Sequence, residues 1–92
     1  MQASQMLPDH LDETRLNGTT IRKGTVGAFL VNARVWSDPH ASAASRAEAA
    51  RDIEEALPAL LALGLFDVLD IRDPDLRAWL AELGASIKQE QA

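Results

Sequence analysis

Apolar residues between Thr25 and Ser37 recur at helical spacing and predict the element around which this chain folds. One stripe, with the spacing i, i+3, i+4, i+7 and i+10, consists of Val26, Phe29, Leu30, Ala33 and Trp36. A second stripe, on roughly the opposite side, consists of Ala28, Val31 and Val35. A helix that is apolar on nearly all sides is normally buried on more than one of them. We therefore expect the other elements to pack around this helix, with Thr25 as its N-cap.

A second helical pattern follows from Ser45 to Leu63. Its apolar side consists of Ala49, Ile53, Ala56, Leu57, Leu60 and Leu61. We expect the preceding loop to end at about Ser42 or Ser45, and Ser45 and Glu48 have the spacing of a capping box. Gly64 is suited to the left-handed conformation that ends many helices. Pro58 predicts either a kink or a division into two shorter helices.

The last helical pattern begins at Asp73, which is suited to an N-cap, and Pro74 suits the first helical position. The apolar stripe consists of Leu76, Trp79, Leu80 and Leu83. We expect Gly84 to end this helix. The preceding segment, Leu65 to Arg72, is too short for its period to decide between a strand and a helical turn that fills the core with Phe66 and Leu69.

The segment Glu13 to Arg22 predicts a β-hairpin, because Asn17 and Gly18 suit a two-residue turn between short β-prone runs. Leu16 and Ile21 then share the inward face. The predicted fold class is therefore α+β and mostly α, with an N-terminal hairpin packed on a bundle of about three helices.

The chain has 92 residues, which is enough for one domain. We expect a single domain over residues 1–92, with residues 1–10 and 85–92 flexible. There is no cysteine, which is typical of a reducing compartment. We see no signal-peptide pattern and no apolar run that could span a membrane. The simplest location is therefore the cytoplasm, and we expect no membrane partner.

The net charge of −5 is unevenly distributed. Residues 14–46 carry five basic residues and one acidic residue, whereas residues 47–92 carry ten acidic and four basic residues. The candidate basic patch consists of Arg15, Arg22, Lys23 and Arg34. An acidic protein is a poor non-specific binder of nucleic acid, so we expect these bases to pair with the acidic half, and nucleic acid is an alternative partner only.

Candidate catalytic chemistry is sparse. Asp38 and His40 are two residues apart on a loop, but two ligands do not make a metal site. The carboxylates Asp67, Asp70, Asp73 and Asp75 do not have the spacing of an EF-hand loop. We therefore predict no catalytic, metal-binding or cofactor-binding residue and no enzymatic activity.

The sequence instead indicates surplus apolar helix surface. Trp36 and Trp79 lie on apolar stripes, and tryptophan is favoured both in cores and at interfaces. The candidate interface consists of Trp36, Val31, Val35 and Trp79. In so small a chain, an apolar central helix can bury one side against a second copy, so a homodimer is plausible.

The runs TVGAFLVNARVW and EALPALLALGLF resemble those of a family of short bacterial proteins that form a domain of unknown function. The resemblance covers residues 17–66. It implies a shared structural design that includes Gly24, Thr25, Asn32, Pro58 and Gly64 to Phe66, and it brings no activity or site residues.

We predict a small non-catalytic module for protein interaction or regulation, with a second copy of itself as one candidate partner. The alternative is a DNA-binding transcriptional regulator that uses the basic region 14–34. The third hypothesis is a small-ligand binder or enzyme.

Overall fold

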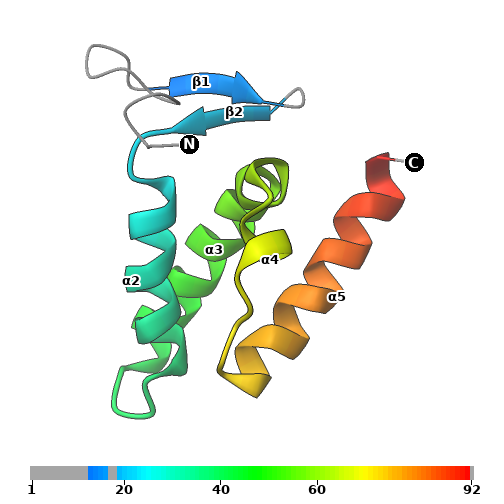
Figure 1. Cartoon of the computed structure of the whole chain (residues 1–92). Coiled ribbons are helices and arrows are strands. Elements are labelled where there is room, and N and C mark those ends of the chain that lie inside the picture. Colours follow the sequence, from blue (N-terminus) through cyan, green and yellow to red (C-terminus); the bar gives the residue numbers. More distant parts are fainter. Residues whose placement is uncertain (1–12, 17–18, 92) are drawn as a thin grey trace.

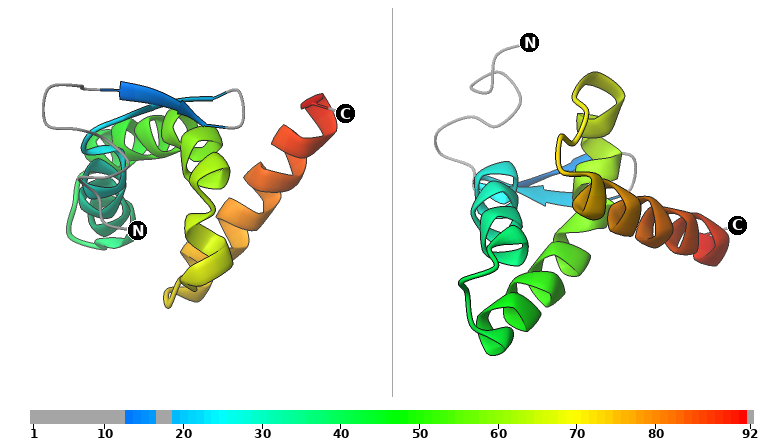
Figure 2. Two further views of the ribbon diagram at one scale, coloured as in Figure 1. Left: turned by 45° about the horizontal axis from the view of Figure 1, so that its top comes forward. Right: turned by 90° about the horizontal axis from the view of Figure 1, so that it is seen from below.

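The computed structural model describes residues 13–16 and 19–91, and they form a mostly helical fold (Figure 1). The elements, in chain order, are β1 (Glu13–Leu16), β2 (Thr19–Arg22), α2 (Thr25–Ser37), α3 (Ala43–Leu63), α4 (Leu65–Val68) and α5 (Pro74–Gln91). The two strands lie across one end of the helices, and α2 and α5 lie on opposite sides of α3 and α4 (Figures 1 and 2).

The strands β1 and β2 pair antiparallel, with Glu13 opposite Arg22 and Leu16 opposite Thr19. The predicted turn at residues 17 and 18 lies outside the described residues, as do the side chains of β1. The packed N-terminal hairpin therefore stays a prediction. In β2 the Ile21 side chain is buried, and this strand contacts α3.

The core is organised around α3, and the expectation that α2 is the central element is wrong. One apolar side of α3 contributes Ile53, Leu57 and Leu60, which are almost fully buried. They form one cluster with Phe29, Leu76 and Leu80. Helix α3 contacts α2, α4, α5 and β2. The apolar stripe of α3 forms most of the core because it is longer and purely aliphatic, so its residues can pack against two neighbouring helices.

Helix α2 buries only one of its two apolar stripes. Phe29 is its one buried residue, whereas the side chains of Leu30 and Val31 are 55% and 63% exposed. The predicted N-cap at Thr25 is also wrong. Gly24 occupies that position with a φ of 82°, and the Thr25 hydroxyl donates to the carbonyl of Arg22 at 2.8 Å.

The ends of α3 lie close to the predicted positions, with one correction. Ser42, not Ser45, is the N-cap, and its hydroxyl accepts a hydrogen bond from the backbone N–H of Ser45 at 3.0 Å. Pro58 lies inside one continuous helix, so the helix is not divided. Gly64 ends α3 as predicted, with a φ of 76° that an L side chain rarely adopts.

The segment after Gly64 forms the helical turn α4, which settles the choice between strand and helix. Phe66 reaches the core, where its ring meets that of Phe29 edge-on at 5.8 Å. Leu69 does not fill the core, because its side chain is 57% exposed. The chain then extends to Asp73, where α5 begins.

Helix α5 begins as predicted and continues past the expected stop. Asp73 Oδ1 accepts hydrogen bonds from the N–H groups of Asp75 at 2.9 Å and Leu76 at 3.3 Å. The predicted end at Gly84 is wrong, since the helix runs to Gln91. Residues beyond Gly84 keep helical spacing, and Ile87 packs against the same core cluster as Leu83.

Replacing a buried leucine of α3 tests the assignment of the core. Leu60 is fully buried, so we expect Leu60→Ala to lower the free energy of unfolding by about 3 kcal/mol. The same change at the exposed Leu69 serves as the control and should alter it by less than about 0.5 kcal/mol. Urea unfolding of the two variants measures both values. Equal losses would contradict the assignment.

Candidate functional site

The described imidazole and carboxylate candidates do not gather into a group that could hold a metal ion. Among the described residues, no three His, Cys, Asp or Glu side chains come together in a group that could hold a metal ion. Asp38 accepts a hydrogen bond from the backbone N–H of His40 at 2.8 Å, which makes a local turn.

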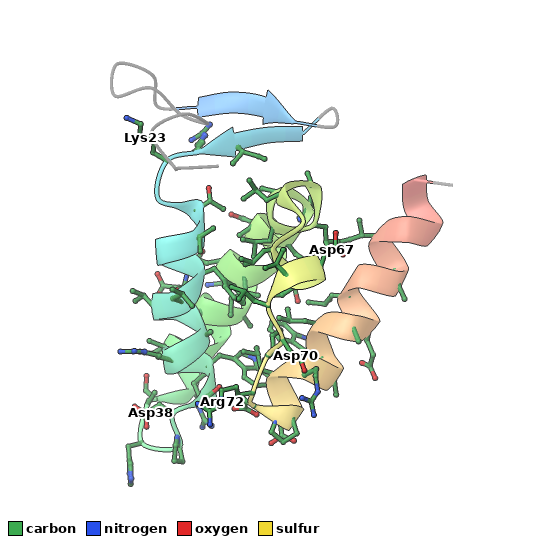
Figure 3. All side chains as sticks on the ribbon, in the orientation of Figure 1. Lys23, Asp38, Asp67, Asp70 and Arg72 are labelled. Carbon is green, nitrogen blue, oxygen red and sulfur yellow. The ribbon has the colours of Figure 1, made fainter. Side chains whose placement is uncertain are left out.

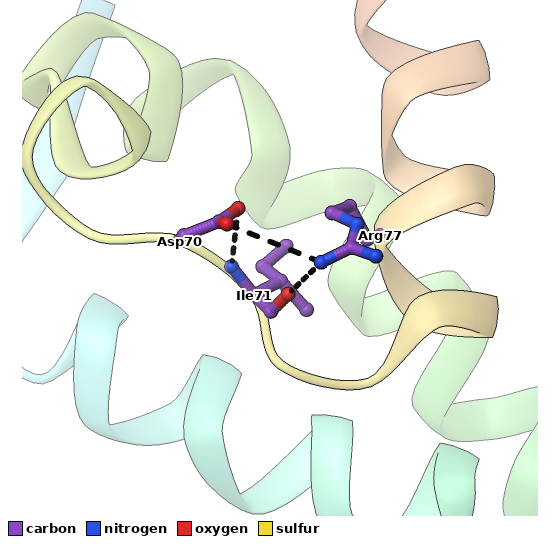
Figure 4. A network of polar contacts seen from close by, with 3 residues as sticks. All are labelled: Asp70, Ile71 and Arg77. Carbon is purple, nitrogen blue, oxygen red and sulfur yellow. Dashed lines mark hydrogen bonds and ion pairs between the residues drawn. The ribbon is translucent and has the colours of Figure 1, made fainter.

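Of the four carboxylates Asp67, Asp70, Asp73 and Asp75, Asp70 and Asp73 have structural partners, and Figure 4 shows those of Asp70. Asp70 Oδ1 accepts from the N–H of Ile71 at 3.0 Å, and Asp70 Oδ2 lies 3.9 Å from the guanidinium of Arg77. Arg77 also donates to the carbonyl of Ile71 at 2.9 Å. These contacts tie the chain between α4 and α5 to the first turn of α5.

The second of these residues, Asp73, is the N-cap of α5. The Ser37 hydroxyl, followed by the N–H groups of Leu76 and Asp75, lowers its pKa below the ordinary value of 3.8. All of these donors stabilise the charged carboxylate. The interaction joins the end of α2 to the start of α5, which indicates a structural role for Asp73.

An apolar groove lies between α2 and the segment that joins α4 to α5. We call it the α2 groove. It has a volume of about 430 Å³. Its apolar lining consists of Val26, Phe29, Leu30, Ala33, Leu65, Phe66, Leu69, Ile71 and Leu76. Arg34, Ser37, Asp70, Arg72 and Asp73 complete the lining. This composition is typical of a surface that accepts apolar side chains.

A second apolar groove, the α5 groove, lies on the other side of the same segment and has a volume of about 410 Å³. Leu57, Leu61 and Leu80 belong to its apolar lining. Helix α5 contributes three small residues to it, Ala81, Gly84 and Ala85. A Cβ atom added at Gly84 would meet nothing within 4 Å outside its own helix, so the groove is open above this position.

The segment between the two grooves is an exposed apolar ridge, which we call the linker ridge and define as residues 66–71. Phe66, Leu69, Asp70 and Ile71 line both grooves. The side chain of Val68 is 83% exposed and that of Leu69 is 57% exposed. Large apolar side chains clustered beside two apolar grooves indicate an interaction surface more than an ordinary scatter of surface residues.

The predicted interface residues do not form one surface. Trp36 and Trp79 are half-buried and stack on each other, with ring centroids 5.0 Å apart and ring planes 7° from parallel. This stack joins α2 to α5 within the chain. Val35 is half-buried, whereas Val31 is exposed on the side of α2 opposite the buried Phe29.

The predicted basic patch is interrupted by acidic neighbours. Arg22 shares a polar cleft with Asp52 and Glu55 of α3. Lys23 and Arg34 are exposed towards opposite ends of α2. The side chain of Arg15 lies outside the described part of the chain. Asn32, which interrupts the apolar pattern of α2, lines the same polar cleft as Arg22 and is half-buried.

Sequence reasoning missed the linker ridge because its residues have no periodic pattern. Val68 and Leu69 look like core residues in the run LFDVLDIR, and Gly84 looks like a helix end. The one available signal was that Asp67 and Asp70 interrupt this apolar run, which is typical of a segment that is not fully buried.

No family model, curated protein or solved structure matches this chain. The resemblance to short bacterial proteins of a domain of unknown function therefore stays a prediction. None of the helices in the part of the chain that the structure describes has the length and apolar character needed to cross a membrane.

The lowered pKa of Asp73 predicts a pH-dependent contribution to stability. A carboxylate whose pKa is lowered by folding stabilises the protein above its unfolded pKa, and this contribution is lost as pH falls through the folded pKa. We expect the stability difference between the wild type and Asp73→Asn to shrink as pH falls below 3.8. Urea unfolding at a series of pH values measures it. A difference that stays constant into acid would contradict the assigned cap.

Proposed function

We propose that this protein is a non-catalytic interaction module whose linker ridge and flanking grooves bind an amphipathic segment of a partner protein. The observation that carries the proposal is the exposure of Leu69, which lines both apolar grooves, and of Val68 next to it in the chain. Full burial of a side chain of this size contributes about 1.5–3 kcal/mol. Covering the ridge therefore makes a favourable contribution to binding.

The shape of the α5 groove favours a helical partner segment. Ala81, Gly84 and Ala85 present no large side chain, so the backbone of a second helix can approach α5 closely. A glycine inside a helix costs about 1 kcal/mol relative to alanine. Gly84 has a helical backbone and open space above it, so neither its conformation nor its neighbours require a glycine. A partner helix would provide a reason for it.

The charged residues at the edge of the grooves indicate which charge a partner segment should carry. Asp70 is paired with Arg77, and Asp73 caps α5, so both carboxylates are engaged within the chain. Arg72 is exposed and lines the α2 groove beside them (Figure 3). A carboxylate next to the apolar residues of the partner would meet this guanidinium. The partner segment is therefore apolar on one face with an acidic residue at its edge.

The DNA-binding alternative draws less support from the structure. The exposed side of α3 carries Glu48, Asp52, Glu54 and Glu55, whose charges repel phosphates. Arg22, the central base of the predicted patch, lies beside two of these acids. The cytoplasmic location stays a prediction.

Filling the α5 groove tests the proposed function. The full chain is immobilised and used to select binders from a library of phage-displayed random peptides. We expect selected peptides with apolar residues at helical spacing and an adjacent acidic residue. Gly84→Leu should weaken their binding at least tenfold, because its side chain fills the groove, although leucine is the better helix former.

Ala78→Leu is the matched control, because it lies on the same helix, is exposed and does not line the groove. It should leave binding unchanged. The proposal is wrong if no peptide is selected, or if the selected peptides bind the Gly84→Leu variant as tightly as the wild type.

A further inference from the structure

The outward face of α2 forms a second surface outside the linker ridge, and it meets the rim of the α2 groove at Leu30 and Arg34. Gly27, Val31, Arg34 and Asp38 recur at helical spacing on the side opposite the buried Phe29. All four are exposed, and Val31 is 63% exposed. Leu30, beside Val31, is 55% exposed. This face therefore carries apolar side chains at its centre and has no side chain at Gly27.

Nothing in the described part of the chain explains a glycine at Gly27. It lies inside α2, does not adopt a positive φ, and a Cβ added there would meet nothing within 4 Å outside its own helix. Glycine in a helix interior lowers stability relative to alanine. A helix that approaches closely from outside needs the space that a glycine leaves, so Gly27 points to an external helix.

The charges at the two ends of α2 are complementary to those of a second, antiparallel α2. Lys23 precedes the helix and Asp38 follows it, and both are exposed (Figure 3). In an antiparallel pair centred between Leu30 and Val31, each Lys23 lies opposite Asp38 of the second copy. In the same register, each Gly27 lies opposite Arg34 of the second copy, and the missing side chain leaves room for the arginine stem.

We propose that two copies of this chain associate through their α2 helices, antiparallel and about a twofold axis between Leu30 and Val31. An isologous interface of this kind repeats every contact twice, so the Lys23–Asp38 pair forms at both ends. The antiparallel alignment also places the positive end of each helix dipole beside the negative end of the other. This inference names a second copy as the occupant of a surface other than the linker ridge.

The size of the surface sets the strength of the association. Helix α2 has 13 residues and is about 20 Å long, so one helix pair buries less than the standard of roughly 800 Å² per partner. Interfaces below that size are typical of transient complexes. We therefore expect a weak, transient dimer that forms and dissociates with concentration.

A charge swap tests the dimer. Sedimentation equilibrium of the full chain over micromolar to submillimolar concentrations gives the dimerisation constant. Lys23→Glu places like charges together at both ends and should weaken the dimer about tenfold, which corresponds to about 1.4 kcal/mol from two exposed pairs. Adding Asp38→Lys to this variant restores opposite charges and should restore the wild-type constant. Arg51→Glu, an equal change of charge on the exposed side of α3, is the control and should have no effect.

Gly27→Leu gives a second, independent readout. It favours the helix but blocks close approach, so it should abolish the dimer while the thermal unfolding midpoint is kept or raised. A wild type that is monomeric throughout the range, or a dimer indifferent to both Lys23→Glu and Gly27→Leu, overturns the inference. Neither variant alters the α5 groove, so peptide selection against the linker ridge reports separately on the proposed function.

Discussion

The whole structure depends on one contact, the burial of the aliphatic side of α3 against α2 and α5. Ile53, Leu57 and Leu60 are almost fully buried and meet Phe29 on one side and Leu76 and Leu80 on the other. A chain of this size has room for only a modest core. Helix α3 lies between α2 and α5, so these two helices make little direct contact with each other. The main links between them are the Trp36–Trp79 stack and the interaction of Ser37 with Asp73.

This arrangement leaves apolar surface uncovered in two places. The core takes one stripe from α2, so Leu30 and Val31 stay at the surface. The chain between α4 and α5 is anchored by Phe66 and by Asp70 and Arg77, but Val68 and Leu69 point away from the core. Both regions lie beside a glycine with open space above it, Gly27 in the first and Gly84 in the second. The proposed functions follow from this surplus of exposed apolar surface.

The sequence was sufficient to predict that these helices exist. It also predicted those helix ends that a nearby side chain or glycine determines. The stripe of α3, the cap at Asp73 and the left-handed end at Gly64 follow from spacing and side-chain chemistry alone. The central role of α3, in place of α2, was not predictable in this way, because periodicity shows which faces are apolar and not which of them find a partner. Gly84 was predicted as a helix end, but α5 continues past it because residues further along the helix pack against the core. The linker ridge was not predicted because a short apolar run has no readable period.

Hydrogen exchange of the backbone amides tests the central claim, that the linker ridge is an uncovered docking surface, most directly. The measurement compares the free protein with the protein bound to a peptide selected on it. We predict that residues 66–71 exchange much faster than the centre of α3 in the free protein, because few buried contacts hold them. The bound peptide should then slow exchange at residues 66–71 and 81–85. Protection of residues 66–71 equal to that of α3 in the free protein, or slowing confined to other elements on binding, would contradict the account.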